Sequence, residues 1–202
     1  VKRGEFGGRQ RDTVDDYFAL FLRVTYETAS RLSEPCDLRV KDIGNKATPR
    51  GYTVTFAHTK TADNVTRYGL TAETRERVLA WVKAKKLGPN DFLWPASECG
   101  LSAKTGAEHI TYKSGYRRFK FVAALAGITR RVHPHLLRAS RITDLRNKGA
   151  SKRLIKSMFH IEQDGTIDVY DRPDDDDLDA EAIVLRRKRG WKGFVSPNPN
   201  CT

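Results

Sequence analysis

Cysteine is scarce in this chain of 202 residues, and long apolar runs are missing altogether. The three cysteines, Cys36, Cys99 and Cys201, are odd in number and form no C-x-x-C pair, so the sequence predicts neither a disulfide framework nor a zinc site. This usage fits a reducing, cytoplasmic setting. No apolar run approaches the ~20 residues that a membrane helix needs, and no charged-then-apolar leader opens the chain. We therefore expect no membrane partner.

Acidic residues are outnumbered, because 25 Asp and Glu stand against 37 Lys and Arg, which gives a formal net charge of +12. Such an excess favours a polyanionic partner, since binding releases counterions, and nucleic acid is the leading candidate. Methionine is nearly absent too: Met158 is the only one, and residue 1 is Val. We interpret the chain as the carboxyl-terminal part of a longer protein.

The chain is long enough to bury one good core, with 39% hydrophobic residues. Residues 1–12 are basic, contain glycine and have almost no apolar side chains, which indicates a linker or arm. Residues 13–190 form the single domain that we expect. Residues 191–202 follow as a tail, whose Trp191 and Phe194 could pack on their own domain or on a neighbouring subunit.

Hydrophobic periodicity predicts a mainly α fold with one small antiparallel β-sheet, an α+β class. Apolar residues at helical spacing follow Thr13, a potential helix cap, and we expect a second short helix to begin near Ser30. Residues 52–56 and 65–70 alternate as the strands of a hairpin with a polar tip. Further helices, punctuated by glycines, are expected over residues 71–87, 112–126, 134–148, 151–159 and 179–189.

Basic residues are concentrated between positions 113 and 156, where thirteen Lys or Arg accompany a single acid, Asp144. This composition predicts a surface that faces DNA. The alternative is a set of solvated helix faces, but those normally mix both signs of charge. The residues that we expect to contact DNA are Lys113, Arg117, Arg118, Lys120, Arg130, Arg131 and Arg141.

An imidazole and a guanidinium share one face of the helix expected from residue 134. His135 and Arg138 stand three residues apart, and the guanidinium cannot lose its charge, so the pair suits a phosphodiester. Taken alone, H-x-x-R is common by chance and indicates no more than a helix start with a surface arginine. Downstream, Tyr170 comes ten residues after His160, in a stretch too polar and Gly-broken to be core, so its hydroxyl should be reachable.

Two further cations lie upstream of this pair. Arg31 occupies an expected helix start in the string A-S-R-L-S-E, and Lys60 occupies the tip of the expected hairpin. Each residue has an ordinary explanation: Arg31 could pair with Glu34, Lys60 could be a charged turn residue, and Tyr170 could be a surface anchor. Their joint order of Arg, hairpin Lys, His-x-x-Arg, His and Tyr makes chance the poorer explanation.

That order resembles the catalytic domain of the tyrosine recombinase (phage integrase) family, over nearly the whole of residues 13–190. The string R-L-S-E from Arg31 is similar to the family's first arginine box, and H-L-L-R from His135 is similar to its second. The longer run H-L-L-R-A-S-R-I-T-D-L is most similar to the archaeal branch. Two positions depart from the family: Ala139 stands where a histidine often follows the second arginine, and Phe159 where a glycine often precedes the third-box histidine.

The resemblance implies a DNA strand-transferase in which the hydroxyl of Tyr170 attacks a phosphodiester and forms a 3′-phosphotyrosine. Arg31 and Arg138 would present planar forks to the phosphate oxygens. His135 and His160 would hydrogen-bond the phosphate, with His135 assisting proton transfer from the tyrosine, and Lys60 would protonate the leaving 5′ oxygen. This chemistry needs no metal, no cofactor and no ATP, because the phosphotyrosine bond conserves the energy of the bond that is cut.

We expect a site-specific recombinase or integrase from an archaeal virus, plasmid or integrated element, working as a homo-tetramer on double-stranded DNA. Two rivals are a type IB-like topoisomerase, which shares the chemistry, and a DNA-binding module whose catalytic geometry has decayed. A metal site is not expected, because His133 and His135 lack an evident third ligand and the acidic run Asp174–Asp177 is typical of a solvated loop.

Overall fold

The computed structural model describes residues 16–59, 62–97 and 106–161. Its elements in chain order are α1 (Asp16–Glu27), η1 (Glu34–Asp37), η2 (Val40–Asp42), β1 (Tyr52–His58), β2 (Asp63–Leu70), α2 (Ala72–Lys85), α3 (Tyr112–Leu125), α4 (His135–Asn147) and α5 (Lys152–Phe159). This mainly helical fold with a two-stranded antiparallel sheet confirms the expected class. The potential cap Thr13, the linker, the helix over 179–189 and the tail lie outside the described residues.

The helices α2 to α5 form close to the bounds expected from the sequence. Three of them begin at a hydroxyl residue that accepts a backbone N–H three residues on, a contact that satisfies one donor at a helix start. These caps are Thr71 with Thr74, Thr111 with Ser114, and Ser151 with Leu154. Within the described ranges, no helix is both long and apolar enough to cross a bilayer.

The short helix expected near Ser30 begins later, as the 3-10 helix η1 at Glu34, because the chain first makes a turn after α1. The amide of Ser30 donates to the carbonyl of Thr25 at 3.0 Å, and the amide of Ala29 donates to that of Tyr26 at 3.0 Å. This pair of bonds is a Schellman cap, and Ala29 takes the left-handed conformation that the motif requires, with φ of 47°. Arg31 therefore follows a helix end and lies in a turn, not at a helix start.

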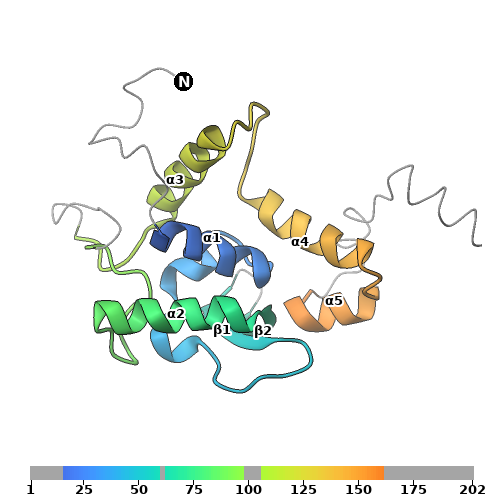
Figure 1. The fold of residues 1–202 in the computed structure, drawn as a ribbon, viewed down its shortest axis with the longest axis horizontal. Helices are drawn as coiled ribbons and strands as arrows, with labels where there is room; N and C mark the ends of the chain where they lie inside the picture. Colours follow the sequence, from blue (N-terminus) through green and yellow to red (C-terminus); the bar gives the residue numbers. More distant parts are fainter. Residues whose placement is uncertain (1–15, 60–61, 98–105, 162–202) are drawn as a thin grey trace, which may run out of the picture.

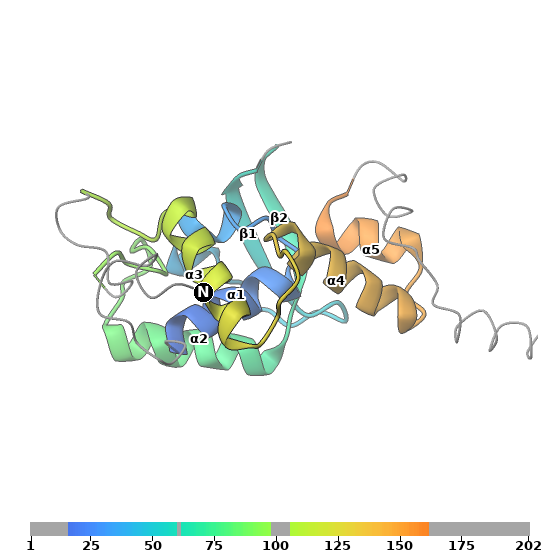
Figure 2. The same ribbon diagram turned by 90° about the horizontal axis from the view of Figure 1, so that it is seen from above.

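The hairpin forms as expected, with Val54 opposite Arg67 and Phe56 opposite Val65 in the antiparallel register. All four of these side chains are buried. Because side chains alternate between the two faces of a strand, the buried face is the one covered by the helices. Figure 2 shows the two strands projecting beyond the helices at the end where they are joined.

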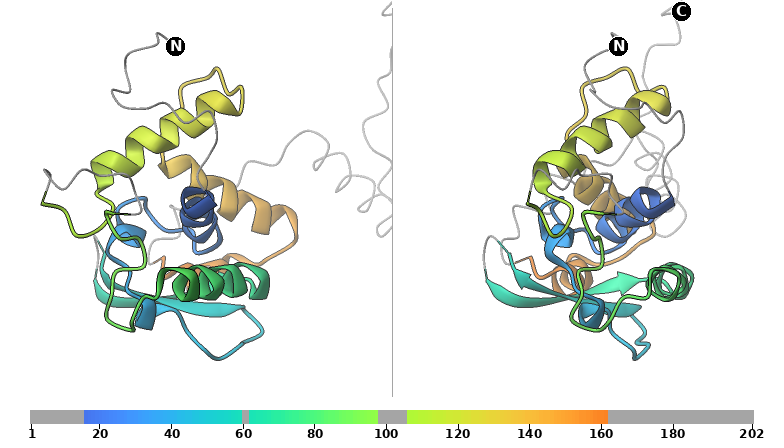
Figure 3. Two further views of the ribbon diagram at one scale, coloured as in Figure 1. Left: turned by 60° about the vertical axis from the view of Figure 1, so that its left-hand side comes forward. Right: turned by 90° about the vertical axis from the view of Figure 1, so that its left-hand side faces the viewer.

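Helix α1 is the centre of the molecule, with α2 and the hairpin on one side and α3 and α4 on the other (Figures 1 and 3). Phe18, Phe21 and Val24 of α1 are buried in the larger core cluster, together with Trp94. The Phe18 and Phe21 rings stack at a centroid distance of 5.4 Å, and the edge of Phe21 meets Trp94 at 5.6 Å. The burial of this aromatic side of α1 fixes where its carboxyl end points.

A smaller core cluster lies at that carboxyl end and joins α4 and α5 to the hairpin. It contains Ala29 from the turn after α1, Ile142 from α4, and Ile155 and Phe159 from α5. Strand β2 comes close here: a Cβ added at Gly69 would lie 2.7 Å from the carbonyl oxygen of Glu27, so a larger residue would collide. The turn after α1 is consequently held by three separate parts of the chain.

Candidate active site

Arg31 is positioned by the turn that ends α1. Its backbone N–H donates to Oε2 of Glu34 at 2.6 Å, and its Nη1 donates to Oε1 of the same carboxylate at 3.1 Å. The side chain of Arg31 stays 34% exposed, and we find no other hydrogen bond from its guanidinium within the described residues. The remaining N–H groups are therefore available to an anion.

Arg138 reaches the same turn from α4. Its Nη1 donates to the carbonyl of Ala29 at 2.7 Å, and the residue is only 4% exposed. Ala29 itself is fully buried against α4 and α5. Arg138 follows Ala29 by 109 positions in the sequence, and this hydrogen bond brings it next to the turn that carries Arg31.

His135 lies on the first turn of α4, one helical turn before Arg138, and part of its side chain is exposed to solvent while the rest is covered by the protein. Partial burial lowers the pKa of its imidazole, and the positive charges of Arg138, His133 and Arg31 lower it further. The rings of His133 and His135 stack at a centroid distance of 6.3 Å. Because the charges of both arginines act on this one imidazole, Arg31, His135 and Arg138 share one neighbourhood, and the pKa of His135 lies below its ordinary value.

His160 ends α5 in a left-handed conformation with φ of 52°, and its side chain is exposed. Its neighbours Phe159 and Ile161 are buried in the cluster that contains Ala29, so the backbone at His160 is anchored near the same turn. Among the described residues we find no hydrogen bond from the His160 ring to the other site residues. The structure thus fixes the backbone position of His160, whereas a contact between its imidazole and a phosphate stays a prediction.

Lys60 and Tyr170 lie outside the described residues. Thr59 and Ala62, the described residues on either side of Lys60, are joined by hydrogen bonds: the amide of Thr59 donates to the carbonyl of Ala62 at 3.0 Å, and its hydroxyl donates to the same oxygen at 2.7 Å. The assignment of Tyr170, nine residues after Ile161, as a reactive tyrosine rests on the sequence alone. The roles expected for Lys60 and Tyr170 therefore stay predictions.

One pair of residues beside the site was missed by reasoning from the sequence. Arg67 of β2 donates through Nη1 to Oε2 of Glu34 at 2.7 Å and through Nη2 to Oε1 at 3.1 Å, and each side chain is 3% exposed. The signal was present: Val65, Arg67 and Gly69 occupy the inward positions of the alternation, where a charged residue requires a buried partner. The sequence suggests Glu34 only as a partner of Arg31, whereas in the structure its carboxylate accepts hydrogen bonds from both Arg31 and Arg67.

The residues expected to contact DNA fall into two groups. Arg118 and Arg141 are partly buried: Arg118 donates to the hydroxyl of Tyr17 on α1, and Arg141 donates to Asp144 at 3.2 Å. The other five are exposed on α3 and on the segment that leads to α4, namely Lys113, Arg117, Lys120, Arg130 and Arg131. DNA contact stays a prediction for both groups.

Metal ligands do not gather in the part of the chain that the structure describes. There, no group of three or more His, Cys, Asp or Glu side chains is placed to hold a metal ion. The pair of His133 and His135 consequently has no third ligand among the described residues.

Comparison with proteins of known sequence gives one curated relative, a tyrosine recombinase of Pseudothermotoga lettingae. The identity is 26% over 151 residues, which covers 75% of this chain and 48% of the relative. The chain therefore spans about half the length of that protein.

Solved structures of recombinases share the fold. The XerH site-specific recombinase bound to a palindromic difH substrate superposes with a TM-score of 0.65 at 21% identity, covering 86% of this chain and 48% of XerH. The XerA recombinase gives a TM-score of 0.62 at 16% identity, covering 92% and 67%. The Tn1549 transposon integrase in complex with circular intermediate DNA gives 0.56 at 16% identity, covering 82% and 56%.

The sequence itself matches a family model across most of its length. The model is that of the phage integrase family, and the match runs over residues 10–176, from the segment before α1 to a point beyond Tyr170. The region contains Arg31, His135 and Arg138, which the fold brings together. The chain belongs to the phage integrase family.

Proposed function

We propose that the protein is a site-specific DNA recombinase that cuts and rejoins DNA strands through a 3′-phosphotyrosine at Tyr170. The observation that supports this most directly is the convergence of Arg31, His135 and Arg138 at the turn after α1. Charge builds on the non-bridging oxygens when a phosphodiester is attacked, and fixed cations at those oxygens lower the barrier. Two guanidinium groups from separate elements supply such cations.

The proposed reaction conserves atoms and charge without an added reactant. The oxygen of Tyr170 attacks phosphorus, its proton passes towards His135, and the bond to the 5′ oxygen of the next nucleotide breaks. Lys60 gives the leaving oxygen its proton, and rejoining reverses these steps with the same or another 5′ hydroxyl. The phosphotyrosine retains the energy of the phosphodiester, so ATP is not required. In this scheme side-chain cations, and not a metal ion, stabilise the negative charge on the phosphate oxygens.

The state of His135 agrees with its role in this scheme. A protonated imidazole could not accept the proton of Tyr170, and a lowered pKa favours the neutral imidazole that can. The neighbouring guanidiniums of Arg31 and Arg138 cause part of that lowering. The charges that stabilise the phosphate therefore also keep the imidazole ready to accept a proton.

The partner, assembly and origin are further parts of the proposal. Double-stranded DNA is supported by the basic composition and by XerH and the Tn1549 integrase, whose structures contain DNA. We propose that the whole protein acts as a tetramer on paired DNA sites inside the cell. An archaeal virus, plasmid or integrated element is the origin that the run from His135 to Leu145 favours.

A suicide substrate tests the proposal. A nicked duplex whose site was selected from a randomised library should trap a covalent protein–DNA adduct on a denaturing gel, and Tyr170→Phe should abolish it. Arg138→Ala should slow adduct formation by roughly 100-fold, the size expected for losing one oxyanion donor, with DNA binding much less affected. Arg130→Ala is the matched control, since Arg130 is exposed outside the site and should lower only affinity.

Other outcomes would point to different functions. Relaxation of supercoiled DNA without any product from paired sites would indicate a type IB-like topoisomerase. DNA binding without an adduct from any sequence would indicate a non-catalytic DNA-binding module. An adduct that persists in Tyr170→Phe would show that another residue is the nucleophile.

A further inference from the structure

Glu34 poses an electrostatic problem for the site. Its carboxylate is buried, and it bonds both the amide and the guanidinium of Arg31, the cation assigned to the phosphate. A carboxylate at 3.1 Å offsets the positive charge of its partner and holds that partner in place. Acting alone, Glu34 would fix the geometry of Arg31 and at the same time weaken its attraction for an anion.

Arg67 occupies the position that resolves this problem. It donates to both oxygens of Glu34, at 2.7 and 3.1 Å, whereas Arg31 reaches only Oε1 with its guanidinium. This two-bond geometry is the strongest that an arginine and a carboxylate form. Glu34 is thus paired first with Arg67 and only secondarily with Arg31.

The surroundings of Arg67 suit a permanent structural cation. The side chain is 3% exposed, and its guanidinium lies 5.0 Å from the centroid of the Phe56 ring, on the neighbouring strand. A buried arginine keeps its charge, because its pKa is too high for deprotonation. Arg67 is therefore closed to solvent, and we find it tied to Glu34 and Phe56 within the described residues.

The titration of Glu34 agrees with this division. Burial raises the pKa of its carboxyl, but the hydrogen bonds and charge of Arg67 act against burial more strongly than the contacts of Arg31, and the net pKa is lowered. Together the three side chains carry one net positive charge. Without Arg67, the remaining pair of Arg31 and Glu34 would carry none.

We propose that Arg67 is a positioning residue: by neutralising Glu34 it lets the carboxylate orient Arg31 without cancelling the charge that Arg31 presents to a phosphate. This inference rests on the proposed function for its consequence in catalysis. Its electrostatic part, the state of Arg31, can be measured without DNA. The electrostatic role of Arg67 and the proposed recombinase function can therefore be refuted by separate experiments.

The first experiment measures adduct formation by the full chain on the nicked substrate, at saturating DNA and under single-turnover conditions. Arg67→Met should slow the reaction by roughly tenfold, less than the loss of a whole oxyanion donor because Arg31 is still present. DNA binding should change by less than about twofold, since Arg67 is almost fully buried and does not present its side chain to DNA. Arg67→Lys keeps the cation and should retain most of the rate.

The double variant Glu34→Gln with Arg67→Met separates this role from simple packing. If Arg67 works by offsetting the charge of Glu34, removing both charges should restore Arg31 and make the double variant faster than Arg67→Met alone. A residue with a purely structural role would give a double variant no faster than the single one. That result, in folded proteins, would overturn the inference.

The second experiment follows Arg31 itself through its modification by phenylglyoxal, located by mass spectrometry, with no DNA present. In Arg67→Met the guanidinium of Arg31 should pair more tightly with Glu34, so its modification should slow by roughly threefold, and inorganic phosphate should protect it less. If Arg67→Met does not fold, Arg67→Lys decides: because the cation remains, both modification of Arg31 and cleavage should stay near wild-type rates, and a large loss of both in the folded variant would overturn the proposal. If the wild-type chain forms no adduct with any DNA, the proposed function fails, while the modification of Arg31 still tests the inference.

Discussion

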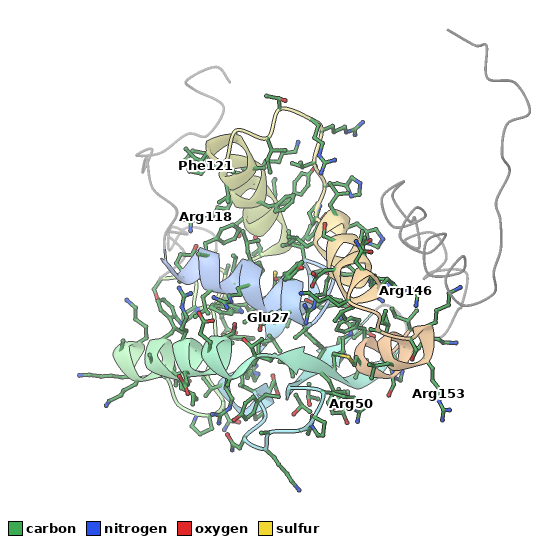
Figure 4. All side chains as sticks on the ribbon, turned by 45° about the vertical axis from the view of Figure 1, so that its right-hand side comes forward. Glu27, Arg50, Arg118, Phe121, Arg146 and Arg153 are labelled. Carbon is green, nitrogen blue, oxygen red and sulfur yellow. The ribbon has the colours of Figure 1, made fainter. Side chains whose placement is uncertain are left out.

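Two buried glutamates, Glu27 and Glu34, flank the turn after α1, and they accept hydrogen bonds from different sets of donors. Glu27, at the end of α1, accepts hydrogen bonds from the amide of Thr71 at 2.9 Å, from the hydroxyl of Thr74 at 2.7 Å and from Arg23 at 3.1 Å. Figure 4 shows Glu27 at the end of α1 that faces α2. Glu34, seven residues later in the chain, accepts only from Arg31 and Arg67 in the described structure.

The difference in donors separates a structural role for Glu27 from the electrostatic role that we propose for Glu34. Thr71 and Thr74 at the start of α2, together with the partly exposed Arg23, make Glu27 a joint between α1, β2 and α2, and within the described ranges it makes no hydrogen bond to the candidate site residues. Glu34 instead pairs with the guanidiniums of Arg31 and Arg67. Because the Arg31 guanidinium is partly exposed at the candidate site, the charge of Glu34 affects the charge of that site. The two glutamates are equally buried, and what differs is that Glu34 pairs with a guanidinium at the candidate site.

Glu34→Gln should give the largest loss of stability of the two substitutions. It leaves the buried cation of Arg67 without its carboxylate, which costs roughly 3–5 kcal/mol of unfolding free energy. Urea denaturation monitored by circular dichroism would measure it. Adding Arg67→Met should recover part of the loss, and a double variant less stable than Glu34→Gln would contradict the ion-pair explanation.

Glu27→Gln should cost less, roughly 1–3 kcal/mol, because it removes hydrogen bonds from mostly neutral donors and strands no buried cation. The same denaturation experiment applies. Adduct formation by the folded fraction should remain within about twofold of wild type. A larger fall in rate would mean that Glu27 acts on the site after all and would break the comparison.

Acid should remove the contribution of Glu34 gradually. The pKa of this carboxyl in the folded chain lies below its ordinary value of 4.5, so the unfolded chain binds a proton first as the pH falls. The stabilisation is complete above that ordinary value and is lost as the pH falls through the lowered pKa of the folded chain. The difference in Tm between wild type and Glu34→Gln should therefore shrink below about pH 4.5, and a constant difference would argue against charge as its origin.

The smallest effect concerns His135. Its imidazole should titrate below its ordinary value of 6.5 in NMR spectra, because of partial burial and because of Arg138, His133 and Arg31. Arg138→Gln should move the midpoint up, towards 6.5, whereas Arg138→Lys should leave it low because a cation remains. As the pH falls below 6.5 the unfolded chain gains this proton before the folded chain, so stability should decline there. An unchanged midpoint in Arg138→Gln would place His135 too far from Arg138 for the proposed site.

Local structure followed closely from the sequence where single residues decide it. Thr71 and Ser151 start helices because a hydroxyl satisfies an N–H at a helix start, and the alternation of Val54, Phe56 and Val65 produces a hairpin. The turn after α1 was the exception. A Schellman cap usually has glycine at its left-handed position. Here that position holds Ala29, so the sequence gives no sign that the helix ends there.

The candidate site was partly readable as well. His135 and Arg138 share a helix face, so their spacing alone predicts that they are neighbours. Their proximity to Arg31 depends on α1 and α4 packing together, and the bond from Arg138 to Ala29 shows it. Arg67 could have been singled out as a charge on an apolar strand face, but nothing in the sequence names Glu34 as its partner.

The sequence by itself determined the elements, the basic character and the order of the candidate catalytic residues, because caps, periodicity and charge are properties of neighbours in the chain. Tertiary structure alone decided which distant charges meet: Arg31, Arg67 and Arg138 come from a turn, a strand and a helix, and they converge on the end of α1. Burial against the core sets that convergence, and burial is a property of the packed molecule. The physical reason is that charge acts through distance in space, which spacing along a chain does not fix.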